Sequence, residues 1–139
     1  MKMEDIGKAD IVLLGVSRTS KTPTSIYLAN RGYKTLNIPL IENRALPNSL
    51  TAEHNKFRVI GLVVEATRLS DIRDNRLEIM KEVNIPNYSN LNYVQEEVKN
   101  SKKLFKKYNW PIVDVTRKLV EETAASVIRI YEIGRGYKK

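Results

Sequence analysis

The sequence predicts an α/β fold in which helices flank a mainly parallel β-sheet. Short apolar runs without polar alternation, such as residues 9–14 and 57–64, are typical of strands that are buried on both faces. Longer segments with helical spacing of apolar residues lie between these runs, and Gly or Pro separates many of them. The length of 139 residues fits one domain.

The first predicted unit is a strand, a loop, a helix and a second strand. Residues 9–14 form the strand, which ends before a glycine and a polar loop. Pro23 is expected at the first helical position, where its missing N–H costs nothing. The helix continues over 24–31, and Gly32 ends it because glycine is common just past a helix end. Residues 35–40 are the second predicted strand.

The rest of the chain repeats this alternation. Residues 41–56 are polar and contain turn residues, which predicts a long connection. The amphipathic pattern is clearest over 91–108. The elements expected after the connection are a strand at 57–64, helices at 69–83 and 91–108, a strand at 112–115 and a helix that contains 120–131.

Composition excludes several classes of site. The chain has no cysteine, so disulfides, cysteine-ligated zinc and thiol nucleophiles are excluded, and the single His54 cannot form a multi-histidine metal site. A net charge of +8 indicates anionic partners. No apolar run approaches the ~20 residues of a membrane span. Residues 1–10 lack the features of a secretory signal, so we expect a cytoplasmic protein without a membrane partner.

The most specific motif is a phosphate-binding loop between the first strand and the first helix. Gly15–Thr22 matches G-x-x-x-x-G-K-[ST] except that Ser20 replaces the second glycine. Backbone N–H groups would hold phosphate oxygens, Lys21 would reach the β/γ-phosphates, and the Thr22 hydroxyl would ligate Mg²⁺. The residues expected around the phosphates are Gly15, Val16, Ser17, Arg18, Thr19, Ser20, Lys21 and Thr22. This motif predicts a three-layer sandwich of the P-loop nucleoside-triphosphate-hydrolase type.

Arginines near the start of the next helix are the second candidate site. Arg73 and Arg76 share a helical face and, with Arg68, could offset charge on a transferred phosphoryl group. The alternative is a solvated face on which Asp71 and Asp74 pair with these arginines.

Carboxylates at the ends of two later strands are the third candidate. Glu65 follows the strand at 57–64, and Asp114 lies near the end of the strand at 112–115. Either could hold magnesium through water or act as a base toward a hydroxyl group. The alternative is that each caps a helix or holds a loop.

Four segments carry a resemblance to a known family. GVSRTSKTPTSIYLANRGYKTLNIPL, RLSDIRDNRL, WPIVDVT and VEETAASVIRIY resemble the pyruvate, phosphate dikinase regulatory proteins, whose bacterial members include phosphoenolpyruvate synthase regulatory proteins. The resemblance extends over about residues 9–131, and serine in place of the second loop glycine is standard in that family.

The resemblance implies a bifunctional enzyme. Such proteins use ADP to phosphorylate a threonine of the dikinase or of phosphoenolpyruvate synthase, and they remove this phosphate with inorganic phosphate, releasing pyrophosphate. Members are about twice as long and match this chain in their C-terminal half. We therefore expect residues 1–139 to be one P-loop domain of a longer protein, with frayed ends at 1–8 and 134–139.

Two other functions stay open on sequence grounds. One is a P-loop kinase that acts on a small molecule, and the other is a non-catalytic module that binds nucleotides. Nucleic acid is the less favoured ligand of such a module, because the basic helix at 91–108 lacks the interleaved aromatic residues of single-strand binders. The oligomeric state is also open, with a homodimer as one option.

Overall fold

Four parallel strands form the centre of the computed structural model. The structure describes residues 8–16, 18–40, 46, 58–80 and 90–136. For residues 74–80 and 135–136 it describes the backbone alone. The strands are β1 (Ile11–Gly15), β2 (Thr35–Pro39), β3 (Val59–Val63) and β4 (Ile112–Asp114). Their order in the sheet is β2-β1-β3-β4, and every neighbouring pair is parallel. The predicted α/β class is therefore confirmed.

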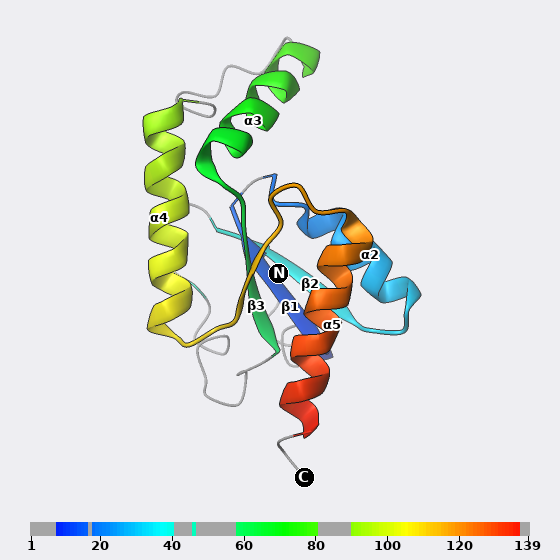
Figure 1. Cartoon of the computed structure of the whole chain (residues 1–139). Coiled ribbons are helices and arrows are strands. Elements are labelled where there is room, and N and C mark those ends of the chain that lie inside the picture. Colours follow the sequence, from blue (N-terminus) through cyan, green and yellow to red (C-terminus); the bar gives the residue numbers. More distant parts are fainter. Residues whose placement is uncertain (1–7, 17, 41–45, 47–57, 81–89, 137–139) are drawn as a thin grey trace.

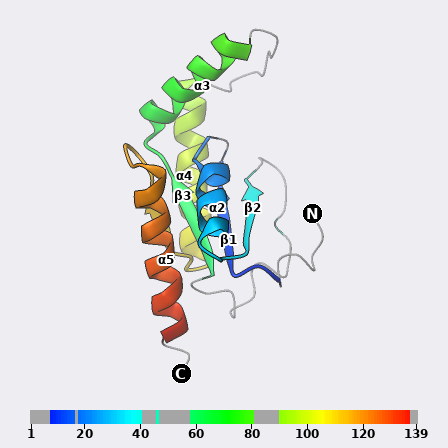
Figure 2. The same cartoon turned by 90° about the vertical axis from the view of Figure 1, so that its right-hand side faces the viewer.

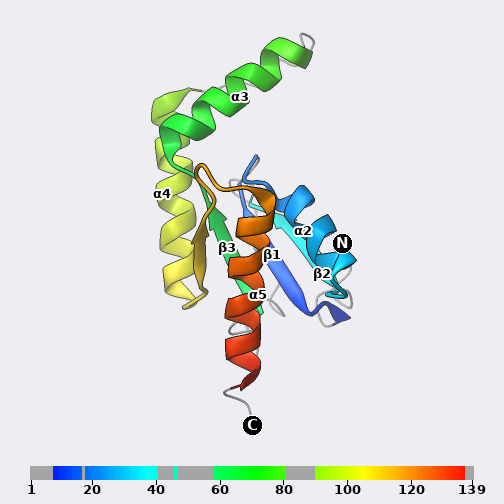
Figure 3. The ribbon, with the colours of Figure 1, turned by 45° about the vertical axis from the view of Figure 1, so that its right-hand side comes forward.

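Helices cover both faces of this sheet. They are α2 (Lys21–Asn30), α3 (Ala66–Met80), α4 (Leu91–Lys107) and α5 (Val120–Gly136). Helices α2 and α5 lie on one face and α4 lies on the other, which gives the predicted three layers (Figures 1 and 2). Helix α3 extends beyond the carboxyl edge of the sheet and contacts α4 there (Figure 3).

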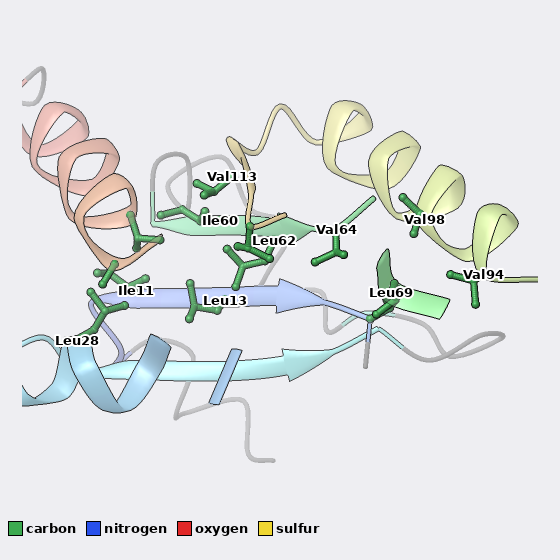
Figure 4. Close-up of a cluster of buried hydrophobic side chains, with 14 residues drawn as sticks. Ile11, Leu13, Leu28, Ile60, Leu62, Val64, Leu69, Val94, Val98 and Val113 are labelled. Carbon is green, nitrogen blue, oxygen red and sulfur yellow. The ribbon is translucent and has the colours of Figure 1, made fainter. Parts of the chain in front are cut away.

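Alternate residues of the strands enter two separate apolar clusters. Ile11 and Leu13 of β1 face the cluster that contains Leu28 of α2, which Figure 4 shows beside the strand. Val12 and Leu14 face the opposite cluster, which contains Phe105 of α4. All four β1 side chains are fully buried, which explains why this strand shows no polar alternation. A third contact, between Leu69 on α3 and Val94 and Val98 on α4, fixes α3 at the carboxyl edge (Figure 4).

Gly61 allows α4 to approach β3 closely. A Cβ atom placed on Gly61 would overlap the ring of Phe105, which is itself fully buried. The sheet face at this point is therefore shaped to receive one aromatic ring, and any side chain on Gly61 would push α4 outward.

We expect Gly61→Ala to lower the free energy of unfolding by about 1–3 kcal/mol through overpacking. Urea denaturation of the single variants Gly61→Ala and Phe105→Leu, and of the double variant, measures this. Because leucine removes the ring that the new methyl group would meet, the double variant should be more stable than the sum of the single effects predicts. Simple additivity would contradict the proposed contact.

Several helix ends differ from the sequence prediction, and α3 begins at Ala66, three residues before its predicted start. Helix α2 begins at Lys21, so Pro23 is the third helical residue and not the first. Proline is tolerated there because N–H groups of the first turn have no intrahelical partner. Helix α5 continues to Gly136, although 134–136 were expected to fray, and 1–7 and 137–139 lie outside the described residues.

Two other predictions fall partly outside the described residues. Of the predicted long connection at 41–56, only Leu46 is described, and the last residues of the predicted helix at 69–83 are not. Over the described residues, no helix has the length and apolar character required to span a bilayer.

The strand order creates one place where connections diverge. The chain leaves β1 toward β2 on one side, whereas β3, the other neighbour of β1, is followed in sequence by β4 on the opposite side. In open parallel sheets, ligands bind beyond the carboxyl ends of strands at such a switch point. The loop after β1 and the start of α3 meet at this point, so a ligand-binding site is expected there.

Candidate phosphate-binding site

Gly15 ends β1 and lets the following loop return over the sheet edge. A Cβ atom on Gly15 would lie 2.5 Å from Thr19 Oγ1 and 3.1 Å from the carbonyl oxygen of Leu62. The backbone of Gly15 is not in the left-handed region. Glycine is therefore required for close approach of the loop, and not for an unusual backbone angle.

Two loop residues adopt left-handed backbone conformations. The φ angles are 69° at Arg18 and 63° at Ser20, and Ser20 occupies the position where the usual motif has its second glycine. Such a conformation costs a residue with a Cβ atom roughly 1–2 kcal/mol. Turns of this kind direct successive N–H groups into one concavity that suits an anion. Ser17 lies outside the described residues.

The N-terminus of α2 faces the same region. Ser20 is the N-cap residue but its side chain makes no capping hydrogen bond, and the first turn contains no acidic residue. Thr24 N–H donates to the Ser20 carbonyl oxygen at 3.1 Å, which is the first bond of the helix. The backbone N–H groups of Lys21 and Thr22 precede this bond, and with the helix dipole they favour a bound anion.

Lys21 places its ammonium group against the loop. Lys21 Nζ donates to the carbonyl oxygen of Val16 at 2.7 Å and to Thr19 Oγ1 at 3.3 Å. Thr19 is fully buried, and its hydroxyl donates to the same Val16 oxygen at 2.9 Å. These three hydrogen bonds fix the conformation of the loop and the position of the Lys21 ammonium group.

The environment of Lys21 destabilises its charged form. Burial, followed by the positive charges of Arg73 and Arg18, lowers the pKa of Lys21 from 10.5 to about 8. A bound phosphate would supply the opposite charge that this lysine lacks, so anion binding and protonation of Lys21 should favour each other.

A cleft of about 430 Å³ opens beside the loop. Among the described residues, its lining contains two cationic side chains and no carboxylate, together with the hydroxyl-bearing Ser20 and Thr22. The lining residues are Arg18, Ser20, Lys21, Thr22, Pro23, Pro39 and Ile72. A cleft with this charge is suited to phosphate groups.

Thr22 is the candidate magnesium ligand within this cleft. Its side chain is exposed and lines the cleft, as a hydroxyl ligand to a phosphate-bound ion requires. Among the described residues, no three His, Cys, Asp or Glu side chains gather as a metal site. These residues fit a magnesium ion held mainly by phosphate oxygens and water, with one protein hydroxyl.

Arg73 is buried and bound to a residue that the sequence analysis did not single out. Only 1% of Arg73 is exposed, and its guanidinium group donates to both carboxylate oxygens of Glu97 on α4, at 2.5 and 3.3 Å. The expected alternative partners, Asp71 and Asp74, lie on its own helix, whereas Glu97 lies across the α3–α4 contact. Glu97 lies next to Val98, which is buried on α4. A carboxylate beside such an apolar surface usually has a cationic partner.

The remaining predicted residues take different positions. Arg68 is exposed near the start of α3, and of Arg76 only the backbone is described. Glu65 is exposed, and its N–H donates to Thr116 Oγ1 at 2.8 Å. Asp114 accepts the N–H of Thr116 at 2.8 Å, so its carboxylate holds the loop after β4. This hydrogen bond agrees with the structural role considered for Asp114, in which its carboxylate holds a loop.

Comparison with known proteins gives three similar relatives. Proteins named pyruvate, phosphate dikinase regulatory protein are 59% identical in Pelagibacter ubique, 49% in Bartonella bacilliformis and 45% in Caulobacter vibrioides. The alignments cover 96%, 91% and 96% of this chain and 48%, 45% and 42% of the relatives, in the same order. The chain thus spans somewhat less than half the length of these relatives.

A family model agrees with these relatives. This family, described as kinase/pyrophosphorylase, matches residues 1–128 and so includes the phosphate-binding loop, both arginine candidates and most of α5. The chain therefore belongs to the kinase/pyrophosphorylase family.

Proposed function

We propose that this chain is the nucleotide- and phosphate-binding part of a bifunctional regulatory enzyme. The enzyme would phosphorylate a threonine of pyruvate, phosphate dikinase or phosphoenolpyruvate synthase with ADP, and remove that phosphate with inorganic phosphate. The observation that carries the proposal is the cationic, carboxylate-free cleft beside a left-handed loop and a helix N-terminus. The names of the relatives support the choice of target.

The loop would act by positioning and by charge. In the forward reaction the threonine oxygen attacks the β-phosphorus of ADP, the P–O bond to the α-phosphate breaks, and AMP leaves. In the second reaction, an oxygen of inorganic phosphate attacks the phosphorus of phosphothreonine, the P–O bond to threonine breaks, the threonine oxygen takes up a proton, and pyrophosphate is the product. Both reactions transfer a phosphoryl group between oxygens through transition states of the same kind, so the same electrostatic stabilisation by the loop would serve both reactions.

Individual residues would have separate tasks. Backbone N–H groups of the loop and of Thr22 would bind phosphate oxygens, and the Lys21 ammonium would offset charge on the transferred group. Magnesium, when bound, would neutralise phosphate charge, with the Thr22 hydroxyl as its protein ligand. Arg18 and Arg76 would supply further cationic contacts, while Arg73, which Glu97 already holds, would contribute through its charge.

We expect this chain to bind pyrophosphate and ADP but to bind the nucleoside adenosine far more weakly. Isothermal titration calorimetry at increasing salt concentration tests this, because contacts between phosphate and Lys or Arg weaken as salt screens them. Failure of both pyrophosphate and ADP to bind would contradict the proposed site.

Transfer is the second stage of the same test. The protein that contains this chain should move the β-phosphate of labelled ADP to a threonine of the dikinase. Transfer to a small-molecule acceptor, with none to the dikinase, would favour the alternative of a small-molecule P-loop kinase.

A further inference from the structure

A second hollow lies between α4 and the carboxyl ends of the two strands β1 and β2. Its volume is about 150 Å³. One wall is the α4 surface that carries Tyr93, Glu96, Asn100 and Leu104, which follow one another at helical spacing. The opposite wall is formed by Val16 and Leu40, which follow β1 and β2 directly.

The hollow and the phosphate cleft are lined by adjacent segments of the chain. Val16 lines the hollow, and its carbonyl oxygen accepts the bond from Lys21 in the cleft. Pro39 lines the cleft and its neighbour Leu40 lines the hollow. The two spaces are therefore lined by neighbouring residues of the same loop and of the end of β2.

A further link passes through the two helices. Ile72 lines the cleft, the next residue Arg73 bonds to Glu97, and Glu97 lines the hollow. The ion pair between Arg73 and Glu97 thus lies between the cationic cleft and the hollow that contains the two glutamates, and it connects the two helices that line them.

The lining of the hollow suits an uncharged group that donates hydrogen bonds. Among the described residues it contains the carboxylates of Glu96 and Glu97 and no cationic side chain, which disfavours a phosphate there. Carboxylates commonly accept hydrogen bonds from ribose hydroxyls of bound nucleotides. Val16, Leu40 and Leu104 offer apolar surface and Tyr93 an aromatic ring, which suit the flat faces of a base.

Its size points to part of a ligand and not to a whole one. Pockets for complete small ligands usually measure roughly 300–1,000 Å³, and this hollow is smaller. The adjacent cleft supplies the remaining space and the opposite charge.

We propose that this hollow binds the nucleoside half of the nucleoside diphosphate whose phosphates occupy the cleft. This inference rests on the proposed function, because it takes the cleft as the phosphate site. Glu96 and Asn100 then select the nucleoside through its hydroxyl and amino groups, and Tyr93 with the three aliphatic side chains covers the base.

Amide chemical shifts of the unaltered chain test this assignment without any variant. Pyrophosphate should shift amides of the phosphate-binding loop, including Lys21 and Thr22, and leave those of Leu40, Asn100 and Leu104 unchanged, whereas ADP should shift both sets. Shifts at Lys21 and Thr22 with ADP, but none around the hollow, would overturn the inference and leave the proposed function intact. No shift at Lys21 and Thr22 with either compound would overturn both.

A filled hollow gives an independent test. Asn100→Trp should raise the Kd for ADP at least about tenfold, which is 1.4 kcal/mol, while the Kd for pyrophosphate stays the same. Lys99→Trp is the matched control, because Lys99 is exposed on the same helix and does not line the hollow. Equal weakening of both compounds by Asn100→Trp, or equal weakening of ADP by the control, would refute the assignment.

Discussion

Replacing Lys21 with alanine in the full-length protein should reduce the proposed ADP-dependent phosphorylation of the dikinase by at least about 10²–10³-fold, the usual effect of removing a preorganised group that stabilises transition-state charge. Lys21 is 9% exposed, and its ammonium is fixed by Val16 and Thr19 at the start of α2. Among the described residues that line the cleft, the second cation, Arg18, differs in placement because it is exposed on the loop. Transfer of labelled β-phosphate from ADP measures the loss.

The phosphate-dependent removal of the phosphoryl group should also fail in the same variant, because both reactions need the charge on the transferred group to be offset. Lys102→Ala is a suitable control, since Lys102 is an exposed lysine on α4 away from the cleft. Retention of more than about a tenth of the activity by Lys21→Ala would show that Lys21 is not the group that offsets phosphate charge.

The same lysine should lower the stability of the fold. Its pKa is about 8 in the folded chain, against 10.5 for a solvated lysine, so the unfolded chain binds more protons between these two pH values. Stability therefore rises with pH across this window and is reduced below it. Lys21→Met should raise the free energy of unfolding at pH 7, and this gain should shrink as pH approaches 10. A gain that does not change with pH would mean that burial of charge is not its cause.

The sequence predicted the sheet because its strands are buried on both faces. Residues 9–14 and 57–64 were predicted as strands of a covered parallel sheet; β1 covers the last four residues of the first run and Gly15, and β3 lies within the second run. The start of α2 was misplaced by two residues because proline fits several positions of a first helical turn. No local pattern shows which one the chain uses.

Part of the candidate site could likewise be predicted from the sequence, and part could not. The loop was predictable because phosphate binding requires glycine, lysine and threonine at fixed spacing after a strand. The bond between Arg73 and Glu97 joins residues 24 positions apart. It depends on how α3 crosses α4 beyond the sheet, and periodicity within one helix carries no information about that crossing. A carboxylate beside a buried apolar stripe was the signal that could have raised Glu97 as a candidate.

Removing Glu97 should have the largest effect on stability of any single change in the site. Glu97→Ala removes the carboxylate that accepts two hydrogen bonds from the Arg73 guanidinium between α3 and α4, where the Arg73 side chain is 2% exposed. Breaking a buried ion pair in this way typically costs about 3–5 kcal/mol. Because 22% of the Glu97 side chain is exposed, we expect a loss near the lower end, about 3 kcal/mol, in urea denaturation.

A paired replacement separates stability from chemistry. Arg73→Met with Glu97→Leu removes both charges, and it should restore most of the lost stability because apolar pairs of similar volume often replace buried ion pairs without cost. An unrestored double variant would mean that the Glu97→Ala loss comes from packing and not from an unpaired charge.

The double variant also decides how Arg73 serves the phosphate site. Arg73 is one of the charges that lower the pKa of Lys21, so its removal should raise that pKa and extend pyrophosphate binding to higher pH. If Arg73 acts only through this charge and by holding α3 on α4, pyrophosphate affinity at pH 7 should change by less than about tenfold. A folded double variant that loses more than about a hundredfold would instead place the Arg73 guanidinium on the phosphate itself, with Glu97 as the partner it leaves when the anion binds.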